Sequence, residues 1–223
     1  PPPTFPHIPM HTHTDTICAI STPPGIGGIA VARVAGPRAI EITDALWHGK
    51  PLAATPAYTA RVGTITEPDG TVLDQAVATV YRAPHSFTGD DIVEIAVHGS
   101  RYVQRRLIAL LSDAGCRVAD PGEFTRRAFM AGKLDLAQAE AVADVIASSS
   151  RAAHRIAISQ LNGTFSRRLA DLRQQLIDLA ALLELELDFS EEDVEFASRT
   201  RLVTLATTLQ TEIRRLLDSY NGG

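Results

Sequence analysis

The hydrophobic pattern of the chain changes once, at Pro121, and this change limits the folds that the sequence can adopt. Before Pro121, short runs rich in Val, Ile, Thr and Ala are bounded by turn residues, which is typical of β-strands. After Pro121 that pattern stops, and apolar residues recur in steps of four and three, as in long amphipathic helices. We therefore predict an α+β fold, in which a mixed α/β part is followed by an all-α part with long helices.

The first part is predicted to form short strands and two helices. One helix begins at Pro37, because proline is favoured at the first helical position, and runs to about Trp47. The other covers residues 101–114 and ends before a glycine. Residues 67–70, with the sequence EPDG, predict a hairpin turn. The predicted strands cover residues 16–20, 29–34, 58–66, 72–81, 92–97 and 116–119.

The second part is predicted to be helical almost throughout. Pro121 opens a short helix that Gly132 closes, and an amphipathic helix follows. An acidic segment at 190–195 then separates two apolar seams, and Ser198 is a candidate N-cap for the last helix. Because apolar seams need partners, we expect further helices to follow in the sequence or to come from another chain. The seams consist of Phe165, Leu169, Leu172, Leu176, Leu179 and Leu183, and of Leu202, Leu205, Leu209, Ile213 and Leu216.

The charge of the chain is mildly acidic. The net charge is −5, and residues 1–120 and 121–223 are both slightly acidic. Neither half has the overall basic charge of a nucleic-acid clamp. An RNA substrate would therefore require a local arginine patch, a basic partner or a further part of the protein.

The sequence carries signals of the compartment in which the protein functions. Cys18 and Cys116 are far apart in the sequence and do not form a disulfide framework, which favours a reducing, cytoplasmic environment. We find no run of 18 apolar residues, so no membrane span is expected. Residues 1–14 are expected to be a disordered lead, and their start lacks the features of a signal peptide.

A loop rich in glycine and proline lies between the first two predicted strands. It covers residues 21–28, with the sequence STPPGIGG. It is not a P-loop, because Gly-Lys-Ser/Thr does not follow, and it is not a Rossmann fingerprint, because a strand follows it rather than a helix. The pattern alone favours a tight turn, while the glycines would also let a ligand approach the backbone.

Two charged residues stand out in apolar or short connecting segments. Glu94 lies in the predicted strand 92–97 and points to the face opposite Val93 and Ile95. It is either a solvent-facing residue or a carboxylate that accepts two parallel hydrogen bonds from a planar N–H edge, such as an aminopyrimidine. Lys133, one of two lysines in the chain, lies between two predicted helices, where an exposed loop residue is the usual interpretation.

Four segments together carry a resemblance to a known family: TPPGIGGIAVARVAG, HSFTGDDIVEIAVHGS, PGEFTRRAFMAGKLDLAQAEAVADVIAS and LELELDFSEEDVEF. In order and spacing they resemble the tRNA modification GTPase family, also called MnmE or TrmE, from about Asp15 to the end of the chain. The resemblance implies an N-terminal domain that binds a tetrahydrofolate, has a fold similar to folate-dependent aminomethyltransferase domains, and forms a homodimer. It also implies a central helical domain into which a GTPase domain is inserted, with GTP, magnesium and potassium as ligands of that GTPase domain.

The same resemblance implies an activity and a set of site residues. The family acts with a flavin-dependent partner, MnmG, and adds an aminomethyl-type group to carbon 5 of the wobble uridine of certain tRNAs. Formyl- or methylene-tetrahydrofolate supplies the one-carbon unit, and the family's folate contacts fall on Arg33, Glu94 and Lys133. No catalytic residue and no metal ligand is expected within this chain.

The resemblance also predicts the domain organisation. Residues 1–14 are the lead, 15–130 the tetrahydrofolate-binding and dimerisation domain, and 131–223 the first part of the central helical domain, ending where the GTPase insert would begin. The chain has no GxxxxGKS or GxxxxGKT motif and no Cys-x-Gly-Lys tail, so we expect it neither to hydrolyse GTP nor to modify tRNA alone. Two alternatives are a stand-alone folate-dependent one-carbon transferase module and a structural dimerisation module without a ligand.

Overall fold

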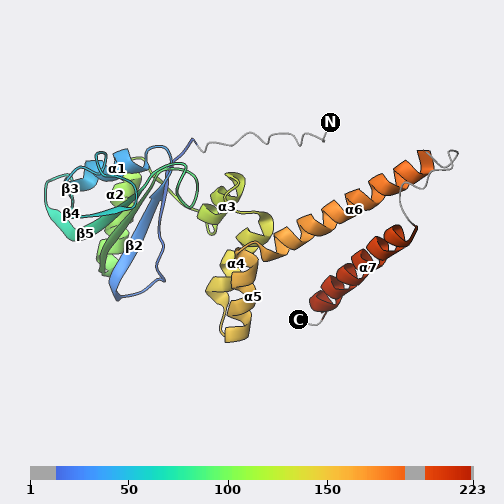
Figure 1. Ribbon diagram of the computed structural model, residues 1–223. Coiled ribbons are helices and arrows are strands. Elements are labelled where there is room, and N and C mark those ends of the chain that lie inside the picture. The colour runs from blue at the N-terminus through green and yellow to red at the C-terminus, as the bar shows by residue number, and fades with distance from the viewer. Residues whose placement is uncertain (1–13, 189–198, 222–223) are drawn as a thin grey trace. The chain divides into compact units, whose positions relative to one another are not determined.

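The structure is a computed structural model that describes residues 14–188 and 199–221. The chain divides into two compact units, Pro1–Val142 and Ala143–Gly223, which we call the sheet unit and the helical unit. The strands are β1 (Ile17–Ile20), β2 (Gly27–Ala35), β3 (Trp47–Gly49), β4 (Thr59–Thr66), β5 (Val72–Tyr81), β6 (Ile92–Gly99) and β7 (Arg117–Val118). The helices are α1 (Ala39–Leu46), α2 (Arg101–Asp113), α3 (Glu123–Met130), α4 (Leu136–Ala147), α5 (Arg151–Leu161), α6 (Thr164–Asp188) and α7 (Arg199–Asn221) (Figure 1).

The strands of the sheet unit form one mixed sheet. Among the described residues it has seven strands in the order β3-β4-β5-β6-β2-β1-β7. Neighbouring strands are antiparallel, except that β1 and β7 run parallel. A mixed sheet followed by helices confirms the predicted α+β class.

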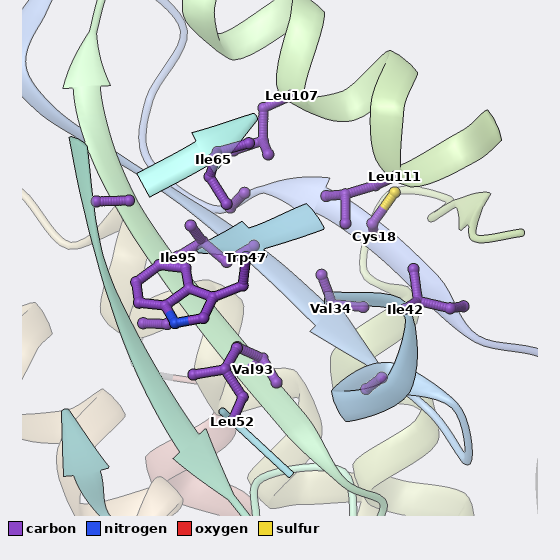
Figure 2. Close-up of a cluster of buried hydrophobic side chains, with 14 of the residues drawn as sticks. Cys18, Val34, Ile42, Trp47, Leu52, Ile65, Val93, Ile95, Leu107 and Leu111 are labelled. Carbon is purple, nitrogen blue, oxygen red and sulfur yellow. The ribbon is translucent and has the colours of Figure 1, made fainter. Parts of the chain in front are cut away.

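One face of the sheet carries the core, because alternate residues of each strand point to it and α1 and α2 pack against it. Helix α2 contributes Leu107, Leu110 and Leu111, which lie on one helical face and are buried. Ser100 caps the start of α2, since its hydroxyl accepts a hydrogen bond from the Tyr102 N–H. Fully burying one such leucine contributes roughly 1.5–3 kcal/mol. Figure 2 shows Leu107 and Leu111 above Trp47, Val93 and Ile95 in this core.

The residues between those core positions point to the other face, which we call the open face of the sheet. Arg33 lies directly opposite Glu94 in the β2–β6 register, and Glu94 lies opposite Thr79 in the β5–β6 register. Because directly opposite residues of antiparallel strands share a face, these side chains are neighbours on the open face. The sheet therefore explains how residues 61 positions apart in sequence come together.

Several predicted boundaries were wrong by a few residues. The helix predicted from Pro37 to Trp47 covers Ala39–Leu46, and Trp47 instead begins β3, a strand that the sequence analysis missed. Helix α3 begins at Glu123, not at Pro121, because Gly122 before it has a φ of 72°, which lies outside the helical region. The last predicted strand, 116–119, is reduced to the two residues of β7.

The helical unit contains the predicted apolar seams. Leu172 of α6 and Leu209 of α7 are buried where these two helices contact each other. Most of the other seam residues whose burial is described remain partly exposed; Phe165, Leu169, Leu176, Leu183 and Ile213 are 40–48 % exposed. Most of residues 1–14, the acidic segment 190–195 and the proposed cap Ser198 lie outside the described residues. The domain boundary expected at residues 130 and 131 stays a prediction.

Within the described segments, no helix combines the length and the apolar character that crossing a membrane requires. Cys18 and Cys116, which are far apart in sequence, are neighbours in the core, and both thiols are free and buried. A hydrogen bond between the two thiols lowers the pKa of Cys18 and raises the pKa of Cys116.

Candidate functional site

Arg33 and Glu94 form an ion pair at the centre of the open face. The Arg33 guanidinium donates from Nε and Nη2 to Glu94 Oε1, at 2.9 and 2.7 Å. Both side chains are 25 % exposed, so the pair is partly shielded from water but accessible to a ligand. Two of the three predicted site residues are thus in direct contact.

The second carboxylate oxygen of Glu94 also has a protein partner. The Tyr81 hydroxyl donates to Glu94 Oε2 at 3.2 Å. Burial raises the pKa of the Tyr81 hydroxyl, and the adjacent Glu94 carboxylate raises it further. Tyr58 stands edge-on to the Tyr81 ring, with the ring centroids 5.9 Å apart. Tyr81 therefore remains a neutral hydrogen-bond donor at neutral pH.

Two phenylalanine rings lie next to Arg33. Its guanidinium carbon is 5.5 Å from the Phe87 ring centroid and 5.4 Å from the Phe124 ring centroid. Phe87 comes from the loop between β5 and β6, and Phe124 from the first turn of α3. We call Arg33, Glu94, Tyr81, Phe87 and Phe124 the Arg33 site. It combines flat apolar surfaces with a cation and a carboxylate, which is the combination that a planar heterocycle with polar edges requires.

Lys133 lies against the same loop that carries Phe87. Gly89 in that loop has a φ of 84°, and a Cβ at this position would lie 3.4 Å from Lys133 Cε and 3.2 Å from Ala131 Cβ. The Lys133 N–H donates to the Ala128 carbonyl at 2.9 Å, just after the end of α3. The third predicted residue therefore belongs to the segment that borders the Arg33 site.

A buried ion-pair network fixes α3, and with it Phe124. Glu123 and Arg127 are 3 % and 1 % exposed at their side chains, and Arg127 Nη2 donates to Glu123 Oε1 at 3.0 Å. Arg117 Nη1 donates to Glu123 Oε2 at 3.0 Å. Asp15 accepts from both Arg117 and Arg127 at 2.7 Å. Hydrogen bonds from Arg117 lower the pKa of Glu123 to about 2, against the effect of burial.

The glycine-rich loop connects β1 and β2, and the Ser21 N–H donates to the Val31 carbonyl at 2.7 Å where the two strands separate. Gln104 Nε2 donates to the Gly25 carbonyl at 3.0 Å, which ties the loop to α2. A Cβ at Gly99 would lie 2.4 Å from the Gly27 carbonyl oxygen, so β2 and β6 approach too closely for a side chain there. Close strand packing accounts for this glycine without a ligand.

The hydrogen bonds of Glu94 limit what it can bind. A carboxylate has about four acceptor positions, and Arg33 and Tyr81 occupy three of those of Glu94. One position on Oε2 is therefore open, and two parallel hydrogen bonds to a ligand require Arg33 or Tyr81 to move.

The aromatic members of the Arg33 site were not predicted from the sequence. Phe87 and Phe124 both lie in segments that carry the family resemblance, HSFTGDD and PGEFTRR. A phenylalanine flanked by polar residues, whether in a predicted loop or a short predicted helix, has no apolar neighbours in sequence to bury it. That isolation was a usable signal of a role in a site.

The fold and site define a class of protein with a mixed α/β sheet domain, an arginine–carboxylate–aromatic site and a following helical domain. Residues 16–133 match the family model described as GTP-binding protein TrmE N-terminus, and residues 136–223 match the MnmE helical domain. The chain belongs to the MnmE/TrmE family of tRNA modification GTPases.

Similar proteins support the same assignment. The chain is 53 % identical over 213 residues to a tRNA modification GTPase MnmE of Parabacteroides distasonis, covering 93 % of the chain and 46 % of that relative. It is 51 % identical over 211 residues to the protein of the same name from Cytophaga hutchinsonii, covering 95 % and 46 %. For the Salinibacter ruber protein the identity is 48 % over 212 residues, covering 95 % and 46 %. The chain thus spans about half the length of the relatives it matches.

Proposed function

We propose that this chain binds formyl- or methylene-tetrahydrofolate at the Arg33 site, as part of a protein that modifies tRNA. The observation that carries the proposal is the Arg33–Glu94 pair, with two phenylalanine rings next to the Arg33 guanidinium, within the part of the chain that matches the TrmE N-terminus. The match of residues 136–223 to the MnmE helical domain argues against a stand-alone one-carbon transferase.

Each group at the site has a role that follows from its chemistry. Glu94 accepts hydrogen bonds from the amino-pyrimidine edge of the pterin, while Phe87 and Phe124 offer apolar surfaces for its flat ring. Arg33, released from Glu94, and Lys133 bind carbonyl, formyl or carboxylate oxygens. The folate, when bound, supplies the one-carbon unit, and the residues of this chain hold and orient it.

The test is a calorimetric titration of the chain with 5-formyltetrahydrofolate, comparing the unmodified protein with Glu94→Gln. Gln keeps the shape but removes the charge, and a hydrogen bond to a charged group contributes roughly 1.5–3 kcal/mol, so affinity should fall by about tenfold or more. The matched control is Glu67→Gln, because Glu67 is likewise paired with an arginine, Arg106, but lies in the turn between β4 and β5. Equal affinities of Glu94→Gln and the unmodified chain would remove Glu94 from the site.

We also propose that the sheet unit forms a homodimer through its open face. Away from the Arg33 site, this face exposes Ile29, Val62 and Val77 by 68, 79 and 39 % of their surfaces. These side chains line a shallow depression of about 260 Å³. An apolar surface of this kind is stabilised by burial against a second copy, and symmetric pairing is the commonest way for one chain to do so.

The activity of the whole protein belongs to this proposal as well. Together with an MnmG-type flavin-dependent partner, it adds an aminomethyl-type group to the wobble uridine of certain tRNAs in the cytoplasm, and it hydrolyses GTP with magnesium and potassium. The chain described here supplies no phosphate-binding loop of the GxxxxGKS or GxxxxGKT type. A GTPase assay on the purified chain should therefore give background rates, and an authentic rate above background would contradict this assignment of roles.

A further inference from the structure

A basic segment lies in the helical unit of this acidic chain. Residues 145–170 contain four arginines and one histidine but no Asp or Glu, whereas the whole chain has a net charge of −5. The segment consists of the end of α4, all of α5 and the first two turns of α6 (Figure 1). The local excess of positive charge is therefore not evident from the net charge of the whole chain.

Two of the four arginines of this segment line one cavity, and a third lies on the same helical face as one of them. Arg151 and Arg155 are four residues apart on α5, so they share one face of the helix, and both are exposed. Arg155 of α5 and Arg168 of α6 line a cavity of about 440 Å³. The other lining residues are Ile156, Ser159, Gln160, Thr164 and Phe165. Two cations, three side chains that can donate hydrogen bonds and a ring that is 40 % exposed therefore surround the same space.

Some of these arginines have protein partners and others are available. Arg168 forms an ion pair with Glu212 of α7. Arg167 donates to the Asn162 carbonyl at 2.8 Å. Among the ion pairs of residues 14–188 and 199–221, none involves Arg151 or Arg155. At least two positive charges are thus free to meet a ligand.

The arrangement is unfavourable for the helices by themselves. Helix N-termini carry a partial positive charge, which acidic residues in the first turn normally compensate. The first turns of α5 and α6 contain no acidic residue, and Arg151 is the first residue of α5. Bound anions would relieve this repulsion, so the arginines are better explained by a ligand than by helix stability.

We propose that the cavity between α5 and α6 is a docking surface for the phosphate backbone of RNA. The inference rests on the proposed function, in which tRNA is the substrate. Arginine binds phosphate oxygens through several N–H groups, the Ser159, Gln160 and Thr164 side chains suit further phosphate and sugar contacts, and an exposed phenylalanine provides a surface on which an unpaired base stacks. A local patch of this kind is what an acidic chain requires to hold RNA.

The test measures binding of the chain to fluorescently labelled tRNA by anisotropy at several salt concentrations. The variant is the double substitution Arg151→Gln/Arg155→Gln. The control is Arg101→Gln/Arg105→Gln, which removes the same charge from an exposed pair with the same spacing on α2. We expect the first variant to bind roughly tenfold more weakly and to lower the slope of log K against log salt by about 1.5, while the control changes little.

A second variant should change tRNA affinity in the opposite direction. Glu212→Gln removes the carboxylate that pairs with Arg168, so it should tighten tRNA binding. Circular dichroism checks that each variant retains its helices. Equal affinities of the α5 variant and the α2 control, or no binding of tRNA by the unmodified chain, would overturn the inference. Competition by polyglutamate as effective as that by unlabelled tRNA would instead assign the surface to an acidic protein, and would overturn it as well.

The same samples separate this inference from the proposed function. The Arg33 site lies in the sheet unit, so the α5 variant should bind 5-formyltetrahydrofolate as the unmodified chain does. Folate binding without arginine-dependent tRNA binding would refute the RNA surface alone, whereas tRNA binding without folate binding would refute the folate site alone.

Discussion

Replacing Glu123 by Gln should destabilise the sheet unit, because the Glu123 carboxylate joins α3 to β7 through Arg117. Its side chain is 3 % exposed and accepts hydrogen bonds from Arg117 and Arg127. The Asp120 N–H also donates to Glu123 Oε2, at 2.8 Å. Gln preserves the size of the side chain but removes the charge that two arginines compensate, so the buried Arg127 would keep only Asp15 of its two counter-charges.

The magnitude and the pH dependence follow from the pKa of Glu123. The network lowers this pKa from 4.5 to about 2, and a difference of about 2.5 units corresponds to about 3 kcal/mol. Because the folded-state pKa is depressed, the stabilisation is present in full above the unfolded-state pKa and is lost as the pH falls towards the folded-state pKa. The difference between the two proteins should therefore be about 3 kcal/mol at pH ~7 and about 2 kcal/mol at pH ~3.5.

The single tryptophan, Trp47, makes the measurement selective for the sheet unit. It is 6 % exposed in the core between α1, α2 and the sheet, so its fluorescence reports the unfolding of that unit. Urea unfolding curves of the unmodified protein and Glu123→Gln, recorded over this pH range, give the two free energies of unfolding. Glu41→Gln is the control, because Glu41 is an exposed helix residue paired with Arg38, and its midpoint should not move. A difference below about 1 kcal/mol at neutral pH, or one that does not shrink with acidification, would refute the reasoning.

Two further outcomes are expected. Phe124→Leu should weaken binding of 5-formyltetrahydrofolate by roughly three- to tenfold in calorimetry, because it removes the ring that lies 5.4 Å from the Arg33 guanidinium. An unchanged dissociation constant would exclude that ring from the site. Val62→Lys should convert the chain from dimer to monomer in analytical ultracentrifugation, because it places a charge on the apolar open face. Val72→Lys, at the exposed start of β5, should remain dimeric. If both variants formed dimers, the dimer interface would not lie on the open face.

Much of the fold was predictable because its signals are local. The strand β5 was predicted with its observed bounds, because both its alternating burial and the turn before it follow from the residue types of a short stretch of sequence. The missed strand β3 has only three residues and follows α1 directly, so hydrophobic periodicity cannot show where the helix ends and the strand begins. It forms because Trp47 pairs with Ile65 in the β3–β4 register, a contact that only the folded chain makes.

The site was predictable only in part, for a related reason. Glu94 stood out by its position in an apolar strand and Lys133 by its position between two predicted helices, and the family resemblance added Arg33. That Arg33 is directly opposite Glu94 depends on the register of β2 against β6, which includes an irregularity between Gly27 and Ala30. The two phenylalanines reach Arg33 from a loop and from α3, and such convergence of distant segments has no signature in a sequence.

The most direct test of the central claim is a crystal structure of the chain with 5-formyltetrahydrofolate bound. We expect density for the pterin ring beside Phe87 and Phe124, with its amino-pyrimidine edge on Glu94 and with Arg33 or Tyr81 displaced from the carboxylate. Density for the ligand at another place on the sheet unit, with the hydrogen bonds among Arg33, Tyr81 and Glu94 intact, would contradict it.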